Sequence, residues 1–174
     1  MKIFVAGGGV RTPLIIRPPK NSGFTRTGEI ESGPVRVKDL APTILSYAGV
    51  VRPQTRYGDR AIVPASGVDL KPYLTGAKPK PRLPGEWMAF ELMGNSYLID
   101  GEYKVMRQRT GMWGDGQWHL YNIVKDPGET KPLDKQDPAR LKQMVGQYDQ
   151  YAKEKGIVPV ADNWNPWSAF GQVN

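Results

Sequence analysis

The sequence contains no cysteine and only one histidine among its 174 residues. The absence of cysteine excludes disulfide bonds, thiolate zinc sites and a cysteine nucleophile, and it leaves the redox compartment open. His119 has no second histidine to join it at a site, so we expect it to be structural rather than catalytic or metal-binding. Long apolar runs are also missing. No stretch approaches the roughly 18 apolar residues that a membrane-spanning helix needs, and the run at residues 3–6 is shorter than a signal-peptide core of about 7 residues. We therefore expect a soluble chain without an export signal.

Positive charge is concentrated in the first third of the chain. The formal net charge is +7, and residues 1–60 contain ten Lys or Arg against four Asp or Glu. Such an excess is typical of a surface that faces an anionic substrate, a polyanionic glycan or nucleic acid. Because the basic residues are spaced out rather than clustered, an acidic partner surface or plain solvent exposure is the simpler interpretation.

The first half of the chain contains one apolar run, one helical pattern and long polar loops. Residues 10–17 include the run Leu14-Ile15-Ile16, which predicts a strand buried on both faces of a parallel sheet. Asp39 is placed as a helix N-cap, and Gly49 is placed to end that helix. Residues 77–84 (AKPKPRLP) indicate a linker. The apolar face of the predicted helix consists of Leu40, Ile44, Tyr47 and Ala48.

The second half predicts an antiparallel sheet followed by a helix. Tight turns such as Asp100-Gly101 separate segments with the composition of strands. Asp137-Pro138 marks the start of a helix and Gly156 its end. We expect a four-stranded meander that this helix covers on one face, and then an aromatic tail that packs on the surface. The predicted strands are residues 86–93, 96–99, 103–109 and 118–123, the apolar stripe of the helix is Leu141, Met144, Val145, Tyr148 and Ala152, and the tail carries Trp164, Trp167 and Phe170.

Five motifs, in this order along the chain, resemble the C-terminal part of sulfatases. Two of them resemble the family's Gly-Gly-Ile/Val-Arg-x-Pro strand start and its Asp-Leu/Ile-x-Pro-Thr helix, and another resembles its Trp-x-Leu-Tyr-Asp-Leu strand with the following Asp-Pro-x-Glu turn. The similarity is greatest to bacterial arylsulfatases, within the alkaline-phosphatase-like superfold. The segments are Gly8–Pro13, Val37–Gly49, Gly67–Gly76, Gly101–Lys104 and Trp118–Glu129.

The resemblance implies a fold of two parts. Residues 1–76 would be the C-terminal end of the sulfatase large α/β domain, an α/β remnant made of a short strand-helix piece. Residues 77–174 would form an α+β subdomain, in which a four-stranded antiparallel sheet is packed by a C-terminal helix and followed by the aromatic tail.

The resemblance also defines which catalytic parts this sequence does not contain. In sulfatases the nucleophile is a formylglycine made from the first residue of a Cys/Ser-x-Pro-x-Arg motif. This chain has no cysteine, and the segment Ser22–Arg26 lacks the proline. Ser32–Arg36 (SGPVR) matches the pattern in its letters, but it follows the Gly8–Pro13 motif and so lies outside the half of the family that carries the nucleophile. Calcium, bound by clustered Asp and Asn oxygens, is expected in intact family members. We expect no cofactor in this chain and no metal site at Asp162-Asn163.

Two residues are assigned to substrate binding by the resemblance. Sulfatases have a lysine nine positions before the Arg of the Gly-Gly-Val-Arg motif, and it contacts the substrate sulfate. Lys2 occupies that position here, nine residues before Arg11. Arg11 is the second anion contact, with a structural ion pair as its alternative role. A cation beside the ester would stabilise negative charge that develops on the sulfate oxygens. No catalytic residue is expected, and Gly7 stands where the family usually has an acidic residue.

These observations lead to two hypotheses of function. In the first, the chain is a C-terminal fragment of an arylsulfatase-like sulfuric ester hydrolase, inactive alone. In the second, it is a non-enzymatic module whose basic residues 1–60 bind an anionic ligand or a partner protein. The predicted strand at residues 10–17 would present unpaired backbone, so we expect a homo-oligomer or a complementary N-terminal sulfatase half to cover it. Neither a membrane nor a nucleic acid is an expected partner. Family members are found in the periplasm and the cytoplasm, and the compartment stays open.

Overall fold

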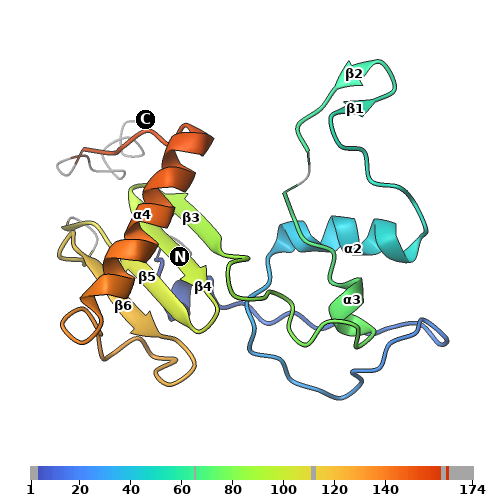
Figure 1. Cartoon of the computed structure of the whole chain (residues 1–174), viewed down its shortest axis with the longest axis horizontal. Coiled ribbons are helices and arrows are strands. Elements are labelled where there is room, and N and C mark those ends of the chain that lie inside the picture. The colour runs from blue at the N-terminus through green and yellow to red at the C-terminus, as the bar shows by residue number, and fades with distance from the viewer. Residues whose placement is uncertain (1–3, 65, 111–112, 162–163, 165–174) are drawn as a thin grey trace, which may run out of the picture. The chain divides into compact units, whose positions relative to one another are not determined.

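Two compact units make up the chain in the computed structural model, which describes residues 4–64, 66–110, 113–161 and 164 (Figure 1). The first unit combines residues 1–13 with residues 84–174, and the second consists of residues 14–83. The assignment of residues 1–76 and 77–174 to two parts of a sulfatase stays a prediction. No helix in the described ranges is long and apolar enough to cross a membrane.

The first unit is built on an antiparallel sheet with the strand order β3-β4-β5-β6, as the sequence predicted. The turn between β3 and β4 is Met93-Gly94, where both residues have left-handed backbone. Two left-handed residues suit such a turn because their twist matches that of the paired strands. The turn lies one residue earlier than predicted, because Asn95 already pairs with Leu92. The strands are β3 (Met88–Leu92), β4 (Asn95–Asp100), β5 (Tyr103–Arg107) and β6 (Trp118–Asn122).

A row of apolar side chains crosses all four strands and forms the core beneath helix α4 (Pro138–Lys155), which runs across the sheet (Figure 1). Met144 and Tyr148 of the helix pack on this row, and the Tyr148 hydroxyl lies 2.8 Å from the Ser96 hydroxyl. The predicted apolar stripe is therefore confirmed as the face of the helix that meets the sheet. The row consists of Ala89, Leu98, Val105 and Leu120, which stand opposite one another in the register.

Both ends of α4 follow the sequence signals. The Asp137 carboxylate accepts a hydrogen bond from the Arg140 N–H at 3.0 Å, which satisfies one of the unpaired amides of the first turn. Pro138 occupies the first helical position, where its missing N–H costs nothing. Gly156 ends the helix in the left-handed conformation, with φ of 62°.

The second unit has a small apolar core and several short elements. Its core is formed by Leu70, Tyr73 and Leu74. Such a core is too small to hold 70 residues without further polar contacts. The elements are η1 (Val37–Asp39), α2 (Leu40–Tyr47), β1 (Arg56–Tyr57), β2 (Arg60–Ala61) and α3 (Lys71–Leu74).

Asp39 supplies those polar contacts. Its carboxylate is fully buried and accepts hydrogen bonds from the backbone N–H of Arg36 at 2.8 Å and of Val68 at 2.9 Å. The Arg82 guanidinium donates to both of its oxygens, at 2.8 and 2.7 Å. The predicted N-cap is therefore corrected in detail. A 3₁₀ turn precedes α2, and the carboxylate bonds back to Arg36 and across to two later segments instead of capping the helix.

Helix α2 itself was predicted, and Gly49 follows it with φ of 68°, but the buried face differs from the expected one. Ile44 is exposed, while Pro42 and Thr43 are buried. The Thr43 hydroxyl explains the rotation, because it donates to the Asp39 carbonyl at 2.6 Å and accepts from the Leu70 N–H at 2.9 Å. These two hydrogen bonds of Thr43, rather than the predicted apolar face, therefore decide which side of α2 is buried.

The predicted strand at residues 10–17 is wrong for this chain. Val10 ends the one-turn helix α1 (Gly7–Val10), residues 11–19 have no regular secondary structure, and Ile15 is 90% exposed. A strand needs a neighbour to satisfy its backbone groups. Within the described residues, the strands of the four-stranded sheet pair with one another and β1 pairs with β2, so this apolar run has no strand to join.

Two substitutions test whether the core lies under α4 and whether residues 10–17 are exposed. Leu98→Ala should lower the free energy of unfolding by about 2–5 kcal/mol, because it leaves a cavity under α4. Ile15→Ser should change it by no more than about 0.5 kcal/mol, because the side chain is exposed. Urea denaturation followed by circular dichroism measures both values. An Ile15→Ser cost as large as that of Leu98→Ala would show that residues 10–17 are buried after all.

Candidate functional site

The N-terminal arm, defined as residues 4–13, carries the motif that resembles the sulfatase strand start. It folds back on itself through α1, where the Gly9 N–H donates to the Ala6 carbonyl at 2.8 Å and the Arg11 N–H to the Gly7 carbonyl at 2.9 Å. A Cβ at Gly9 would collide with the Phe4 carbonyl. The glycine-rich sequence therefore allows a turn that is closer than other residues permit.

The arm packs on the face of the sheet opposite to α4. Neighbouring residues of a strand point to opposite faces, so Tyr97 and Ile99 point away from the helix that covers Leu98. Val5 is buried against these two residues, and Val10 packs against the same apolar cluster. The meander is thus covered on both faces, by α4 on one and by the arm on the other.

A buried ion pair fixes the arm to the sheet. The Lys104 ammonium, on β5, donates to Glu129 Oε1 at 2.7 Å and to the Val5 carbonyl at 2.5 Å. The other oxygen of Glu129 accepts the Gly7 N–H at 2.8 Å. The side chains of Lys104 and Glu129 are 1% and 4% exposed. Burial lowers the pKa of Lys104, and the Glu129 carboxylate opposes that shift by favouring the charged ammonium.

The two predicted substrate contacts stand differently in the structure. Lys2 lies outside the described residues, so its sulfate contact stays a prediction. Arg11 is exposed, and its guanidinium donates to the Pro127 carbonyl at 3.4 Å. Its role as an anion contact also stays a prediction. Lys104 and Glu129 were not expected to face the arm, although both lie in segments that resemble sulfatase motifs.

His119 is held between two carboxylates. Its Nδ1 lies 2.6 Å from Asp134 Oδ2, and its Nε2 lies 2.8 Å from Asp115 Oδ2. Two carboxylate acceptors require both ring nitrogens to donate, so the imidazole is held in its charged form. Burial opposes the charge, but the two hydrogen bonds outweigh it and raise the pKa of His119 above its ordinary value. The structural role expected for this residue stays a prediction.

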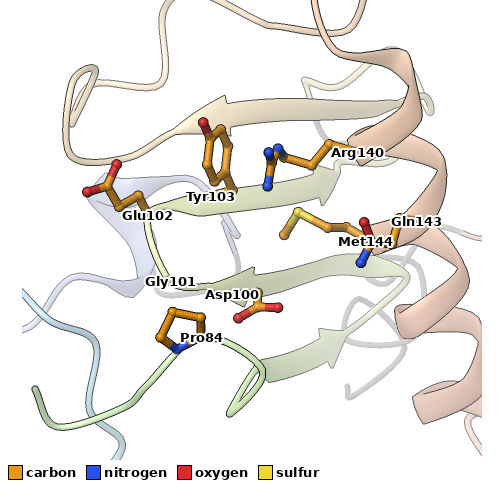
Figure 2. Close-up of a pocket in the computed structure, with 8 residues that line it drawn as sticks. All are labelled: Pro84, Asp100, Gly101, Glu102, Tyr103, Arg140, Gln143 and Met144. Carbon is orange, nitrogen blue, oxygen red and sulfur yellow. The ribbon is translucent and has the colours of Figure 1, made fainter.

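A cavity of about 350 Å³ lies where β4 turns into β5. Figure 2 shows the Tyr103 ring beside the Arg140 guanidinium, 4.0 Å apart, with Asp100 and Glu102 at the same turn. Arg140 is already paired with Asp137 at 2.8 Å. A sulfate group here would meet two carboxylates and a cation that is engaged elsewhere, so this cavity is a poor site for an anionic substrate.

The described residues also bear on the metal expected in intact family members. Among them, no group of three or more His, Asp or Glu side chains is arranged to hold a metal ion. Asp162-Asn163 lies outside the described residues. The expectation that this chain holds no cofactor stays a prediction.

The charge of His119 predicts a pH dependence. We expect NMR titration to give His119 a pKa above the ordinary value of about 6.5, and Asp134→Asn to lower it. Because the folded-state pKa is raised, the stabilisation is fully present below about pH 6.5 and is lost as the pH rises through the folded-state pKa. Asp126→Asn, which removes a carboxylate that does not contact the ring, is the control. An unchanged His119 pKa in Asp134→Asn would contradict the pairing.

Two relatives among the known proteins are sulfatases. No protein-family model matches the chain. An uncharacterized sulfatase of Schizosaccharomyces pombe is 29% identical over 164 residues, which cover 94% of this chain and 28% of the yeast protein. An arylsulfatase of Klebsiella aerogenes is 35% identical over 65 residues, which cover 37% of this chain and 13% of that enzyme. The chain therefore spans less than a third of the length of either relative.

Solved structures share the fold. The crystal structure of Ps i-CgsB superposes with a TM-score of 0.50 and 22% identity, over 78% of this chain and 26% of its own length. A structure from the metabolism of glycosaminoglycans by Bacteroides thetaiotaomicron also has a TM-score of 0.50, with 16% identity over 66% of this chain and 24% of its own. The four-stranded sheet with its C-terminal helix matches these neighbours. The curated relatives named above are sulfatases, and the chain is similar to a C-terminal portion of such proteins.

Proposed function

We propose that the chain is the C-terminal portion of an arylsulfatase-like sulfuric ester hydrolase and that it is inactive alone. One observation carries the proposal: the similarity to a sulfatase extends over 94% of the chain but over only 28% of that relative, and the chain contains no cysteine. Its one Ser-x-Pro-x-Arg segment, Ser32–Arg36, comes after the Gly8–Pro13 motif, in the part of the chain that resembles the C-terminal portion of sulfatases and not the half that carries the nucleophile. The chain would thus be family scaffold that follows the nucleophile in the sequence.

The contribution of this chain to the reaction would come from two basic residues near its N-terminus. Lys2 and Arg11 would place positive charge against the sulfate group and stabilise the negative charge that develops on its oxygens as the ester bond breaks. The described residues supply no ligand cluster for calcium, and we assign no step through a metal to this chain.

A partner for the chain is suggested by the charge of its second unit. Residues 14–83 contain twelve Lys or Arg and five Asp or Glu, a net charge of +7, whereas the remaining residues contain twelve of each. The same unit exposes many large apolar side chains, which soluble surfaces usually keep apart. They include Leu14, Ile15, Ile16, Ile30, Val37, Ile44, Val50, Val51, Tyr57 and Val63.

An acidic surface with an apolar centre is the partner that suits this unit, and a complementary N-terminal sulfatase half would supply it. Pairing two copies through residues 14–83 would bring two surfaces of charge +7 together, which like-charge repulsion opposes. We therefore favour the complementary half over a homo-oligomer formed through this surface.

Hydrolysis of 4-methylumbelliferyl sulfate tests the proposal. The purified chain should release no product above the buffer blank, because loss of a nucleophile lowers turnover by about 10⁶ in a well-studied protease. The Klebsiella aerogenes arylsulfatase in the same assay is the positive control. Turnover by the chain that Lys2→Ala and Arg11→Ala both abolish would overturn the proposed inactivity.

A chimera gives the complementary measurement. In it, this chain replaces the matching segment of the Schizosaccharomyces pombe sulfatase, and the unaltered yeast protein is the reference. If the arm contacts the sulfate, Lys2→Ala in the chimera should lower kcat by about 10²–10³, the usual cost of removing one group that stabilises developing charge. A chimera that is as active with Lys2→Ala as without it would contradict the role of Lys2.

A second candidate function is favoured by the same charge: a non-enzymatic module that binds an anionic polymer. Heparin–agarose chromatography tests it. Under this hypothesis Arg56→Ala/Arg60→Ala, in the exposed β1–β2 hairpin, should elute at lower salt than the wild type, because fewer counterions are released on binding. Lys153→Ala/Lys155→Ala, at the end of α4, is the control of equal charge. Equal elution of the two double variants would count against a binding surface in the hairpin.

A further inference from the structure

We infer that Lys104 and Glu129 are positioning residues, which hold the N-terminal arm in the place from which Arg11 contacts the sulfate group. The inference rests on the proposed function of Arg11, and it names two residues of this chain on which that function would depend. Neither residue would touch the substrate. Both would act through the backbone of the arm.

The two side chains hold the arm by a closed set of hydrogen bonds. The Lys104 ammonium donates to the Val5 carbonyl, the Glu129 carboxylate accepts the Gly7 N–H, and the ammonium and carboxylate bond each other. The bonds thus fall on either side of Ala6. A backbone carbonyl and an N–H that are buried at a sheet surface need partners, and here charged groups provide them with the strength of charge-assisted bonds.

The backbone of Glu129 gives a second, independent observation. Its φ is +55°, in the left-handed region that is unfavourable for residues other than glycine. The turn does not need a glutamate to form, because the Asp126 carboxylate accepts the backbone N–H groups of Thr130 at 2.7 Å and Lys131 at 2.8 Å. A residue held in a strained conformation indicates a functional constraint. The constraint on Glu129 is the carboxylate that reaches Gly7 and Lys104.

The same turn meets the arm at both ends of α1. Glu129 binds Gly7 at the start of the helix, and the Pro127 carbonyl accepts from the guanidinium of Arg11 just beyond its end. A shift of this part of the arm would therefore move Arg11 as well, and misplacing a substrate contact by about 1 Å is enough to lower activity strongly.

A purely structural role would have a different consequence. Removing one member of a buried ion pair leaves the other charge without its partner, which is costly as long as that charge stays buried. Release of the arm would expose the remaining charge to water, and the core of this unit lies beneath α4, on the other face of the sheet. Loss of the pair should therefore release the arm and leave the sheet folded. The test therefore has to measure the order of the arm and the stability of the sheet independently.

The experiment compares Lys104→Met and Glu129→Gly with two matched controls in the full chain. Glu129→Gly removes the carboxylate and also relieves the left-handed backbone, and Met93→Gly relieves the same φ of 55° in a turn that does not contact the arm. Lys142→Met removes an exposed lysine of α4 in place of the buried one. The readouts are amide hydrogen exchange, the melting temperature and the Kd for inorganic sulfate, obtained by NMR titration.

In Lys104→Met and Glu129→Gly, we expect the Gly7 amide to exchange about 100-fold faster, while the amides of Leu98 and Val105 stay protected. The Kd for sulfate, measured well below the melting temperature of each variant, should rise about tenfold or more. A merely structural pair would not cause that change while the amides of the sheet stay protected. Both controls should behave as the wild type. Glu129→Gln keeps an oxygen for the Gly7 N–H and loses the charge. Its Gly7 exchange rate and its Kd for sulfate should lie between those of the wild type and those of Glu129→Gly.

Three results would overturn the inference in different ways. If the Gly7 amide stays protected in both variants, the pair does not hold the arm. If the arm is released but the Kd for sulfate is unchanged, the pair holds the arm without positioning an anion contact. If sulfate causes no shift in the wild-type arm while Gly7 is protected, the proposed role of Arg11 fails and the attachment of the arm stands.

Discussion

The buried pair of Lys104 and Glu129 is the interaction on which the arrangement of the first unit depends. It joins three segments that are far apart in the sequence: the arm, strand β5 and the turn that follows β6. Without it, a lysine would lie under apolar residues with no counter-charge, which costs far more than an exposed lysine. With it, the second face of the meander has a cover, and a sheet of four short strands becomes the middle layer of three.

The second unit is also held together by a buried charged side chain, but here the central group is an anion. There the buried group is the Asp39 carboxylate, and the atoms that it binds are backbone amides and the guanidinium of Arg82. In both units a charged side chain holds backbone groups of distant segments where apolar contacts are few. Small cores gain much from such contacts, since the area that they can bury is limited. The motifs that resemble sulfatases include Asp39, Lys104 and Glu129, so part of the resemblance records how the fold is held together.

The meander and α4 could be predicted because their signals are local. Alternation, two-residue turns and the caps at Asp137 and Gly156 each depend on residues that are close in the sequence. The burial of Lys104 could not be predicted in this way. Alternation with Val105 placed it on the face opposite to the core, and that face is usually solvated in a small antiparallel sheet. Only a contact with Val5, 99 residues away, shows that the face is covered.

Two of the wrong predictions have related causes. The run Leu14-Ile15-Ile16 has the composition of a buried strand, but a strand is defined by its neighbours, and composition does not supply them. Ile44 was placed on the inner face of α2 by its spacing, whereas the Thr43 hydroxyl found two backbone partners and turned the helix. The role of Arg11 was inferred from a motif. A motif identifies the equivalent position in the sequence, but it does not show what the side chain at that position binds.

The separation of charge between the two units makes the chain an electric dipole. One unit carries the whole formal charge of +7, and the other is neutral. In the field of any negatively charged body the chain experiences a torque before it makes contact, within a distance of about 10 Å at ordinary salt. Residues 14–83 would therefore turn toward a negatively charged partner before contact. The charge would then decide the orientation of the encounter, and the exposed apolar side chains of this unit would decide whether binding follows.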